Sequence, residues 1–320
     1  MNNKISNQVH LTDGCVIESD YFYVATQLDD VDPSEVTHSR VSVFDNQSKT
    51  GNKWGYHDVK ASIVAVAVKR TTSFEAGSLI ALSKEGEVEF YSNVSGASVI
   101  EKIPEAGLRL GSLGYVTDIR AIGNSIFVCG YNDQVYQRQA GNWRTLTIAP
   151  LSHRHAAEDD YGVFNCIDGF SENDVYVVGW RGIVWHWNGT GWRKIDVPTD
   201  SDFKCVRCYG ADEVWMCGDN GALMRGNAKT GFKEYSGIDD KKTFYSLAKF
   251  QNSIYLGSME GLYVYSGSTI ELVKSGLNPE IETFTIDAVE STLWSFGSKD
   301  IVSFDGTCWT RIDHPDNEPI

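Results

Sequence analysis

The sequence predicts an all-β protein folded as a single seven-bladed β-propeller with four antiparallel strands in each blade. Its 320 residues include 30 Gly, 9 Trp and 15 Tyr but only 7 Pro, a composition typical of short strands joined by tight turns. A segment of about 40 residues recurs along the chain, and apolar and polar residues alternate within each copy. Six blades are the alternative, if the N-terminal stretch caps the next blade and forms no sheet of its own.

The repeat is clearest in the C-terminal half of the chain. Phe164, Phe203, Phe244 and Phe284 open four segments that are spaced by 39, 41 and 40 residues. Four antiparallel strands repeated at this period are typical of propeller blades, each of which covers an apolar face of its neighbour. We therefore expect one domain over residues 1–320, with approximate blades at 15–57, 63–103, 116–148, 164–195, 203–235, 244–273 and 284–312.

Strands and turns follow the same order in each segment. In the 164–195 segment, strands are predicted at about 165–169, 174–178, 183–187 and 192–195, and turn residues separate them. A glycine recurs at the second turn, and an aromatic residue that we assign to packing between blades recurs in the second strand. The glycines are Gly179, Gly218, Gly257 and Gly297, and the aromatics are Tyr176, Trp215, Tyr255 and Trp294.

The N-terminal segments keep this pattern in a weaker form. The 116–148 segment has Gly130 at the turn, the 63–103 segment has Ser83 there, and the 15–57 segment carries an acidic insertion at 29–35. The last segment already contains four strands. The sequence therefore leaves open how the first and last blades are joined.

Charge excludes several classes of partner. Twenty-eight Lys and Arg residues against 43 Asp and Glu residues give a net charge of −15, whereas nucleic acids and anionic membranes require a positive surface. No basic and apolar leader opens the chain, and no apolar run reaches the length of a membrane span. We expect a cytoplasmic protein that binds neither nucleic acid nor membrane, and whose charged partner is basic.

Two groups of residues resemble metal or redox sites. Cys205 and Cys208 form a CxxC pair, but they fall in a predicted strand, where residues three apart point to opposite faces. His153 and His155 precede three acidic residues in a loop, without a third ligand at fixed spacing, and are weak zinc candidates. The seven Cys are unevenly spaced, as reduced, buried thiols are. We expect neither a metal nor a cofactor.

Catalytic motifs are absent from the sequence. It contains no Gly-x-Ser-x-Gly, no phosphate-binding loop, no Gly-x-Gly-x-x-Gly and no His-Glu-x-x-His. The chain is so acidic that any Asp or Glu pair named as acid and base would be a chance choice. We therefore expect no enzyme and assign no catalytic residue.

Protein-binding residues are predicted on one rim of the propeller. In this fold, the turn between the second and third strands and the link to the next blade emerge on the same face. The turns supply Trp180, Arg181, Asp219, Asn220, Met259, Glu260, Lys299 and Asp300. The links supply Glu158, Asp159, Asp160, Asp200, Asp202, Asp239 and Asp240. Large side chains among carboxylates suit the docking of a basic protein.

The 164–195 segment resembles a family of bacterial propellers with the motif GF-x-x-x-D-[VI]-Y-x-V-G-W-x-G-x-[IV]-W-H-[WY]-[ND]-G-x-x-W. Matching positions are 169–170, 174–176, 178–180, 182, 184–189 and 192, and the stretches 258–263 and 299–309 extend the likeness. Such propellers are associated with genes beside polymorphic toxins of Rhs or type VI-like secretion. The resemblance implies a cognate immunity protein, and no contact residues are carried over from it.

Three functions are compatible with these patterns. The leading hypothesis is a non-enzymatic propeller that binds a basic toxin domain and neutralises it by occluding its active site. The alternatives are a general intracellular scaffold for protein interactions and, less favoured, a propeller enzyme of the glycan-acting or lyase type. A broad exposed rim would favour binding, whereas a deep pocket with convergent polar groups would favour the enzyme.

Overall fold

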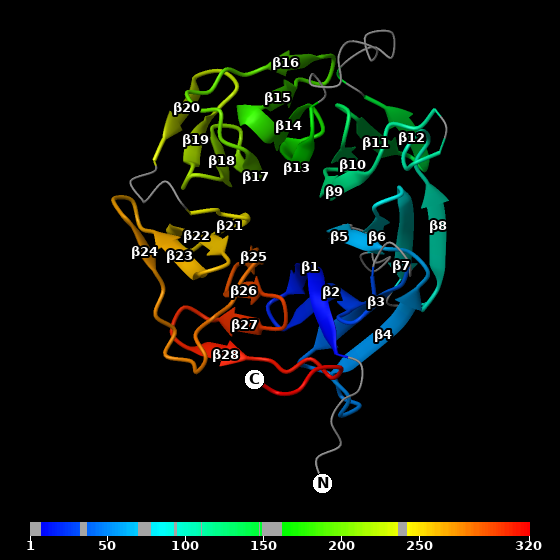
Figure 1. Cartoon of the computed structure of the whole chain (residues 1–320), viewed down its shortest axis with the longest axis vertical. Coiled ribbons are helices and arrows are strands. Elements are labelled where there is room, and N and C mark those ends of the chain that lie inside the picture. Colours follow the sequence, from blue (N-terminus) through cyan, green and yellow to red (C-terminus); the bar gives the residue numbers. More distant parts are fainter. Residues whose placement is uncertain are drawn as a thin grey trace. The chain divides into compact units, whose positions relative to one another are not determined.

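The protein is a seven-bladed β-propeller in the computed structural model, which describes residues 8–32, 37–69, 78–92, 95–109, 111–146, 148, 162–235 and 242–320. Each blade is an antiparallel sheet of four consecutive strands (Figure 1), which confirms the predicted fold class. The described residues contain no α-helix, and no helix among them has the length and apolarity to cross a membrane.

The blades are numbered 1 to 7 in chain order, and their strands have the following bounds. Blades 1 to 3 are β1 (Val9–Glu18), β2 (Tyr21–Leu28), β3 (Ser39–Asp45), β4 (Trp54–Val59); β5 (Ile63–Lys69), β6 (Ser78–Ser83), β7 (Glu87–Ser92), β8 (Ser98–Lys102); β9 (Val116–Ile122), β10 (Ser125–Gly130), β11 (Val135–Gln139), β12 (Asn142–Thr145). Blades 4 and 5 are β13 (Phe164–Ser171), β14 (Asp174–Gly179), β15 (Val184–Trp187), β16 (Trp192–Lys194); β17 (Phe203–Gly210), β18 (Glu213–Gly218), β19 (Leu223–Asn227), β20 (Gly231–Glu234). Blades 6 and 7 are β21 (Ser246–Phe250), β22 (Ser253–Ser258), β23 (Gly261–Tyr265), β24 (Ile270–Leu272); β25 (Thr285–Val289), β26 (Thr292–Phe296), β27 (Ile301–Phe304), β28 (Trp309–Arg311).

The chain separates into two compact units. Unit 1 comprises Met1–Val68 and Tyr245–Ile320, and it holds blades 1, 6 and 7 and most of β5. Unit 2 comprises Lys69–Phe244, and it holds β6 to β8 and blades 3, 4 and 5.

Apolar packing between neighbouring blades forms the core of each unit. In unit 2, Phe127 of blade 3 joins a buried cluster with Phe164 and Val177 of blade 4. In unit 1, Phe22 of blade 1 packs against Trp294 of blade 7, with ring centroids 4.7 Å apart. The second strand of a blade is covered on both faces by this packing, so every residue of β10 and of β26 is buried.

Three of the four recurring second-strand aromatics contact the next blade. The Tyr176 hydroxyl accepts a hydrogen bond from the Ala228 amide of blade 5 at 2.9 Å. The Tyr255 ring lies 6.5 Å from that of Phe304 in blade 7, and Trp294 contacts blade 1 as described. For these three, packing between blades explains the repeat of an aromatic at this position.

Aspartates of the innermost strands tie neighbouring blades together. At four joints, a carboxylate accepts a main-chain N–H from the first strand of the next blade. The pairs are Asp13 with Val66 (2.8 Å), Asp118 with Ile167 (3.0 Å), Asp168 with Cys208 (2.8 Å) and Asp287 with Val16 (2.9 Å). Hydrogen bonds to a charged acceptor are stronger than neutral ones, so these contacts stabilise the joints beyond apolar packing.

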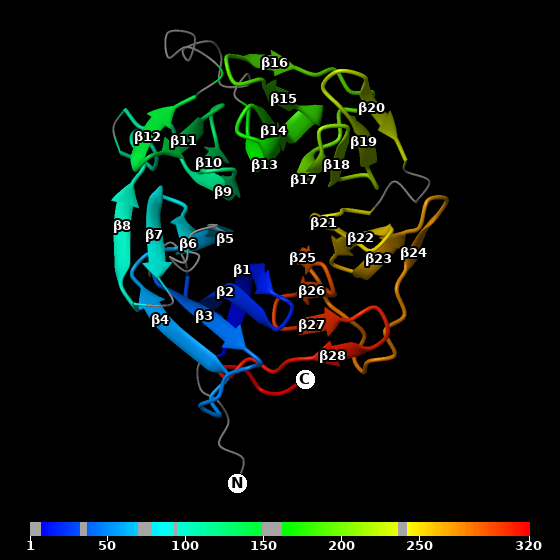
Figure 2. The same cartoon turned by 180° about the vertical axis from the view of Figure 1, so that it is seen from behind.

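Blades 1 and 7 are joined without exchanging a strand. Each owns four consecutive strands, and the Leu11 amide of β1 donates to the Ser298 carbonyl of blade 7 at 2.7 Å. The chain after β28 then runs to blade 1, as the red C-terminal segment shows in Figure 2. There the Asn317 side chain accepts the Val9 amide at 2.9 Å, and Asp316 pairs with Arg40 at 2.8 Å. The joint that the sequence left open is thus made by direct contacts between blades 1 and 7, to which the C-terminal tail adds two more.

Candidate functional site

The candidate site is the set of loops between the second and third strands of blades 3, 4 and 5 in unit 2, hereafter the unit 2 rim. The first residue of each loop, which is Tyr131, Trp180 or Asp219, donates its amide to the carbonyl just before its own blade's first strand. These bonds join Tyr131 to Tyr115 (2.9 Å), Trp180 to Val163 (3.0 Å) and Asp219 to Asp202 (2.9 Å). Tyr131, Trp180 and Asp219 therefore occupy equivalent positions in the three blades and are held by the same main-chain contact.

Main-chain bonds also attach each loop to the link that leads into the next blade. The third loop residue donates its amide in every case: Asp133 to Gly162 (3.1 Å), Gly182 to Ser201 (3.0 Å) and Gly221 to Lys242 (2.7 Å). This contact confirms that the turn and the link lie on one face of the blade, as the sequence analysis assumed. The loop backbones are consequently held in place by main-chain bonds at both their first and third residues.

Two glycines of blade 4 allow this construction. At Gly179, an added Cβ would lie 1.8 Å from the Val163 carbonyl oxygen, so only glycine permits this close approach of the two strands. Gly182 has a φ of +67°, and its Cβ would lie 2.2 Å from the Thr199 carbonyl oxygen. The 3-10 turn Trp180–Gly182 is held between these two points, and Arg181 within it has a left-handed φ of +56°.

Aromatic side chains form a row across blades 3 and 4 on this rim. The rings of Tyr115 and Tyr131 meet edge to face at 6.4 Å, and those of Tyr131 and Trp180 do so at 6.5 Å. At the Tyr115 end, the Lys84 ammonium lies over the ring, 5.3 Å from its centroid. Tyr131 is 37% exposed and Trp180 is 42% exposed. We call Tyr115, Tyr131 and Trp180 the aromatic row.

Carboxylates continue the rim beyond Trp180. The Asp202 carboxylate accepts the Arg181 amide at 2.9 Å, and the Thr243 hydroxyl donates to Asp219 at 2.9 Å. The Lys204 ammonium lies between the two acids, 3.4 Å from Asp202 and 3.0 Å from Asp219. Two carboxylates share one ammonium here.

The structure brings together part of the residue set predicted for partner binding. Trp180, Arg181, Asp202, Asp219 and Asn220 meet on the unit 2 rim. Asp200 is exposed in the link before β17. Seven residues named in the sequence analysis lie outside the described part of the chain: His153, His155, Glu158, Asp159, Asp160, Asp239 and Asp240.

The four predicted residues of unit 1 differ in exposure. Met259, which is 65% exposed, and Glu260 form the turn between β22 and β23. The Lys299 ammonium pairs with the Asp29 carboxylate at 2.5 Å and donates a hydrogen bond to the Gln8 side-chain oxygen. Partial burial raises the pKa of Asp29, but the hydrogen bonds and charges of Lys299 and His10 outweigh it, so that this pKa lies below its usual value.

Asp300 is buried at 3% exposure. It forms a bidentate pair with Arg311, with distances of 2.6 and 2.9 Å. The hydrogen bonds that the Arg311 guanidinium donates to Asp300 raise the pKa of Arg311, and burial opposes this shift. The carboxylate of Asp300 is thus engaged inside blade 7 and is not offered at the rim surface.

The sequence analysis missed Tyr115, Tyr131, Lys84 and Lys204. One signal could have found Tyr131, because it directly follows Gly130 just as Trp180 follows Gly179. Aligning blade 3 on this glycine places the tyrosine at the position of the tryptophan. No comparable signal marks Lys84, which reaches the row from blade 2.

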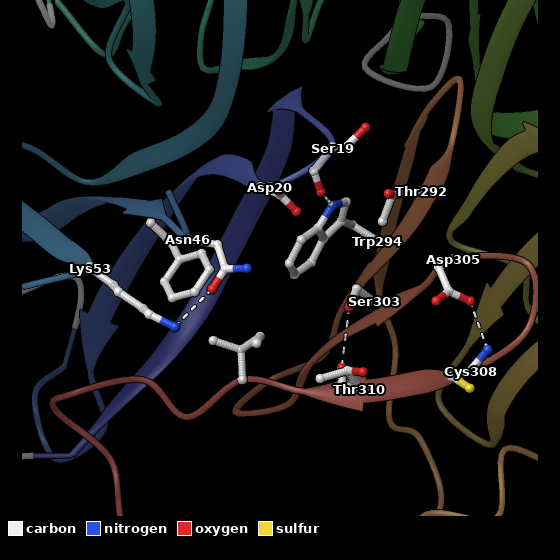
Figure 3. A pocket seen from close by; sticks show the side chains of 12 residues that line it. Ser19, Asp20, Asn46, Lys53, Thr292, Trp294, Ser303, Asp305, Cys308 and Thr310 are labelled. Atoms are coloured by element: carbon white, nitrogen blue, oxygen red, sulfur yellow. Dashed lines mark hydrogen bonds between the residues drawn. The ribbon is translucent and has the colours of Figure 1, made fainter. Parts of the chain in front are cut away.

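A polar pocket of about 350 Å³ lies in unit 1 between blades 1 and 7 (Figure 3). Several of its polar groups are bonded to one another: Lys53 donates to Asn46 at 2.8 Å, and the Trp294 indole donates to the Ser19 carbonyl at 3.1 Å. Asp305 accepts the amides of Thr307 and Cys308 within its own turn, both at 2.7 Å, and these bonds lower its pKa. The Asp305 arrangement is that of a tight turn.

Cysteines of unit 2 are placed as packing residues. Cys129, Cys166, Cys205 and Cys217 are buried, and Cys208 is half-buried with its amide bonded to Asp168. Burial raises the pKa of the Cys129, Cys205 and Cys208 thiols, which makes them poor nucleophiles. Within the described ranges, no three His, Cys, Asp or Glu side chains gather in a way that could hold a metal ion.

Comparison with known proteins supplies one relative over nearly the whole chain and many of the same fold. No protein-family model matches the sequence. The chain is 28% identical over 307 residues to the immune protein Tsi7 of Pseudomonas aeruginosa strain PAO1, covering 94% of this chain and 96% of that protein. The protein is therefore similar, over nearly its whole length, to a protein named for immunity.

Solved propellers confirm the fold alone. The WD40 repeats of RRP9 match 95% of this chain and 91% of theirs, with a TM-score of 0.67 and 11% identity. The propeller domain of Cps50 (Swd1) from Myceliophteria thermophila matches 94% of this chain and all of its own, with a TM-score of 0.65 and 11% identity. YCF48, solved with the D1 peptide, matches 97% of this chain and 94% of its own, with a TM-score of 0.63 and 14% identity.

Proposed function

We propose that this protein is a cytoplasmic, non-enzymatic immunity protein that binds a cognate toxin domain and neutralises it by covering its active site. The observation that carries the proposal is the similarity to the immune protein Tsi7 over 94% of the chain. The similarity also covers 96% of that protein, so it is not confined to one part of either chain.

The geometry of the rim supports binding as the mode of action. Exposed Trp and Tyr side chains are the commonest anchors of protein interfaces, and the unit 2 rim presents Tyr131 and Trp180 on a fixed backbone. Several polar groups of the pocket of Figure 3 are bonded to one another, whereas an enzyme needs polar groups that converge on a substrate.

The net charge of −15 supports a basic toxin domain as the partner. Long-range attraction between opposite charges speeds association, and salt screens it. We therefore expect the association rate to fall several-fold between about 50 mM and about 500 mM salt, while the dissociation rate changes less.

Co-expression tests the proposal. The toxin domain encoded beside this protein's gene is expressed in a bacterial host with this protein, alone, or with an unrelated immunity protein. Growth restored only by this protein, together with a stable complex of the purified pair, supports immunity by binding. Lethality in all three strains overturns it.

Stoichiometry separates occlusion from catalytic inactivation. Purified toxin activity is titrated with this protein. An occluding inhibitor must reach one equivalent to abolish activity, whereas an enzyme that modifies the toxin works at far lower ratios and with a time lag. Time-dependent inactivation at a ratio of one to a hundred would contradict the non-enzymatic assignment.

A further inference from the structure

Resting on the proposed function, we infer that the aromatic row of the unit 2 rim is where the toxin docks, with a toxin arginine stacked on Trp180 and paired with Asp202. The observations that carry this inference are the exposure of the row, its edge-to-face geometry, the cation already seated at one end and the carboxylates at the other.

Ring geometry leaves aromatic faces open along the row. The planes of Tyr131 and Trp180 meet at 71°, and those of Tyr115 and Tyr131 at 81°. An edge-to-face contact uses the edge of one ring and one face of the other, so it cannot cover both faces of either ring. Because Tyr131 and Trp180 are also more than a third exposed, their open faces can receive a partner's side chain.

The row already binds a cation of the protein's own. The Lys84 ammonium lies over the Tyr115 ring, and the Lys84 carbonyl is held by the Val116 amide at 3.0 Å. The negative face of an aromatic ring attracts an ammonium or a guanidinium within about 6 Å. Among the described residues, no such cation lies over Tyr131 or Trp180. A cation from the partner can take that place.

Charge at the other end of the row selects an arginine. The Asp202 carboxylate accepts the amide of Arg181, the residue that follows Trp180 in the chain, so it is held near the indole. One ammonium, that of Lys204, is shared between Asp202 and Asp219. A planar guanidinium can stack on the indole while its edge donates to this carboxylate, whereas a lysine ammonium provides no flat surface for stacking. The chain's net charge of −15 favours the approach of such a basic segment.

The experiment measures the affinity of a catalytically inactive form of the toxin domain encoded beside this protein's gene. We expect Trp180→Ala to raise Kd by at least about 30-fold and Tyr131→Ala by at least about 10-fold, the range of interface hot spots. Phe170→Ala is the matched control. Phe170 is 56% exposed, and it lies at the opposite end of the β13–β14 hairpin from Trp180. Its replacement should change Kd by less than about 2-fold.

Replacement of the toxin's arginines then tests the guanidinium. Each is changed to lysine in turn and combined with Trp180→Ala in a double-mutant cycle. We expect one arginine whose replacement costs at least about 5-fold against the native protein and less than about 2-fold against the Trp180→Ala variant. The same arginine should couple to Asp202→Asn.

The outcomes distinguish the two proposals. If the native protein binds the toxin domain and Trp180→Ala and Tyr131→Ala bind equally well, the docking site is wrong while the immunity function stands. An equal loss of affinity for Phe170→Ala and Trp180→Ala likewise overturns the site. If the row matters but no arginine couples to Trp180, the inferred contact is wrong. If the native protein does not bind the domain at all, the proposed function itself fails.

Discussion

Replacing Asp300 with alanine should destabilise blade 7 strongly, although the sequence presents this residue as part of an acidic rim. The side chains of Asp300 and Arg311 are only 4% and 10% exposed. Their two hydrogen bonds measure 2.6 and 2.9 Å, and the Asp300 carboxylate also accepts the Glu282 amide at 3.2 Å. Asp300→Ala thus leaves a buried guanidinium without its counter-charge and a main-chain N–H without its acceptor.

The magnitude follows from these contacts. Breaking a buried ion pair by removing one partner costs about 3–5 kcal/mol. Arg311 keeps its bond to the Pro279 carbonyl at 2.9 Å, so we take the lower end, about 3 kcal/mol. For a chain of this size, each kcal/mol lowers Tm by roughly 2 °C, which gives a fall of roughly 6 °C.

Urea unfolding followed by tryptophan fluorescence, with a parallel thermal scan, measures this effect. Met259→Ala is the control, because a 65% exposed side chain contributes little to stability. The double variant Asp300→Leu with Arg311→Met should recover part of the loss, since it leaves no unpaired charge. A free energy of unfolding for Asp300→Ala within about 0.5 kcal/mol of the native value would refute the reasoning.

Three further predictions concern a turn, the tail and the thiols. Gly182→Ala should destabilise the protein by more than about 1 kcal/mol in a urea titration, because φ is +67° and the added Cβ would meet the Thr199 carbonyl oxygen. Gly191→Ala is the control and should be near neutral, since its Cβ would meet no atom within 4 Å. Equal unfolding midpoints for the two variants would contradict the predicted strain at Gly182. Burial lowers the pKa of His314 to about 4 from 6.5, so the unfolded chain takes up this proton first as the pH falls. Between pH 6.5 and pH 4, the free energy of unfolding of the native protein should therefore decline by up to roughly 3 kcal/mol more than that of His314→Gln. If the free energies of unfolding of the two proteins change in parallel with pH, His314 is not a buried neutral imidazole. Of the seven cysteines, exposed Cys308 should react within minutes with a thiol reagent, and the others should react only on unfolding; a fast-reacting thiol in the Cys308→Ser variant would show that another cysteine is more accessible than the structure has it.

The fold could be predicted from the sequence because its signals are local. Alternation within a strand requires only the chain's immediate neighbours, and the turn glycine recurs because strands approach too closely there for a Cβ, as at Gly179.

The site could be predicted only in part because contacts between loops decide it. Asp300 and Lys299 follow one another, yet one is buried against Arg311 and the other bridges to Asp29, and neither partner is marked by spacing. Trp180 was found because its blade carries the clearest repeat. Tyr131 occupies the equivalent position in a weaker repeat, and Lys84 reaches the row from another blade.

The joint between blades 1 and 7 has a consequence for synthesis on the ribosome. A propeller that borrows a strand must keep an incomplete first sheet waiting until its last residues are made, and an unpaired strand edge invites aggregation. Here β1 to β4 are consecutive, so the first sheet can pair all its strands once residue 59 has emerged. The contacts of this sheet with blade 7 and with the tail, such as Phe22 with Trp294 and Arg40 with Asp316, form later, once those segments are made. Nascent chains stalled after blade 6 should therefore already contain the complete four-stranded first sheet, while its face toward blade 7 is still uncovered.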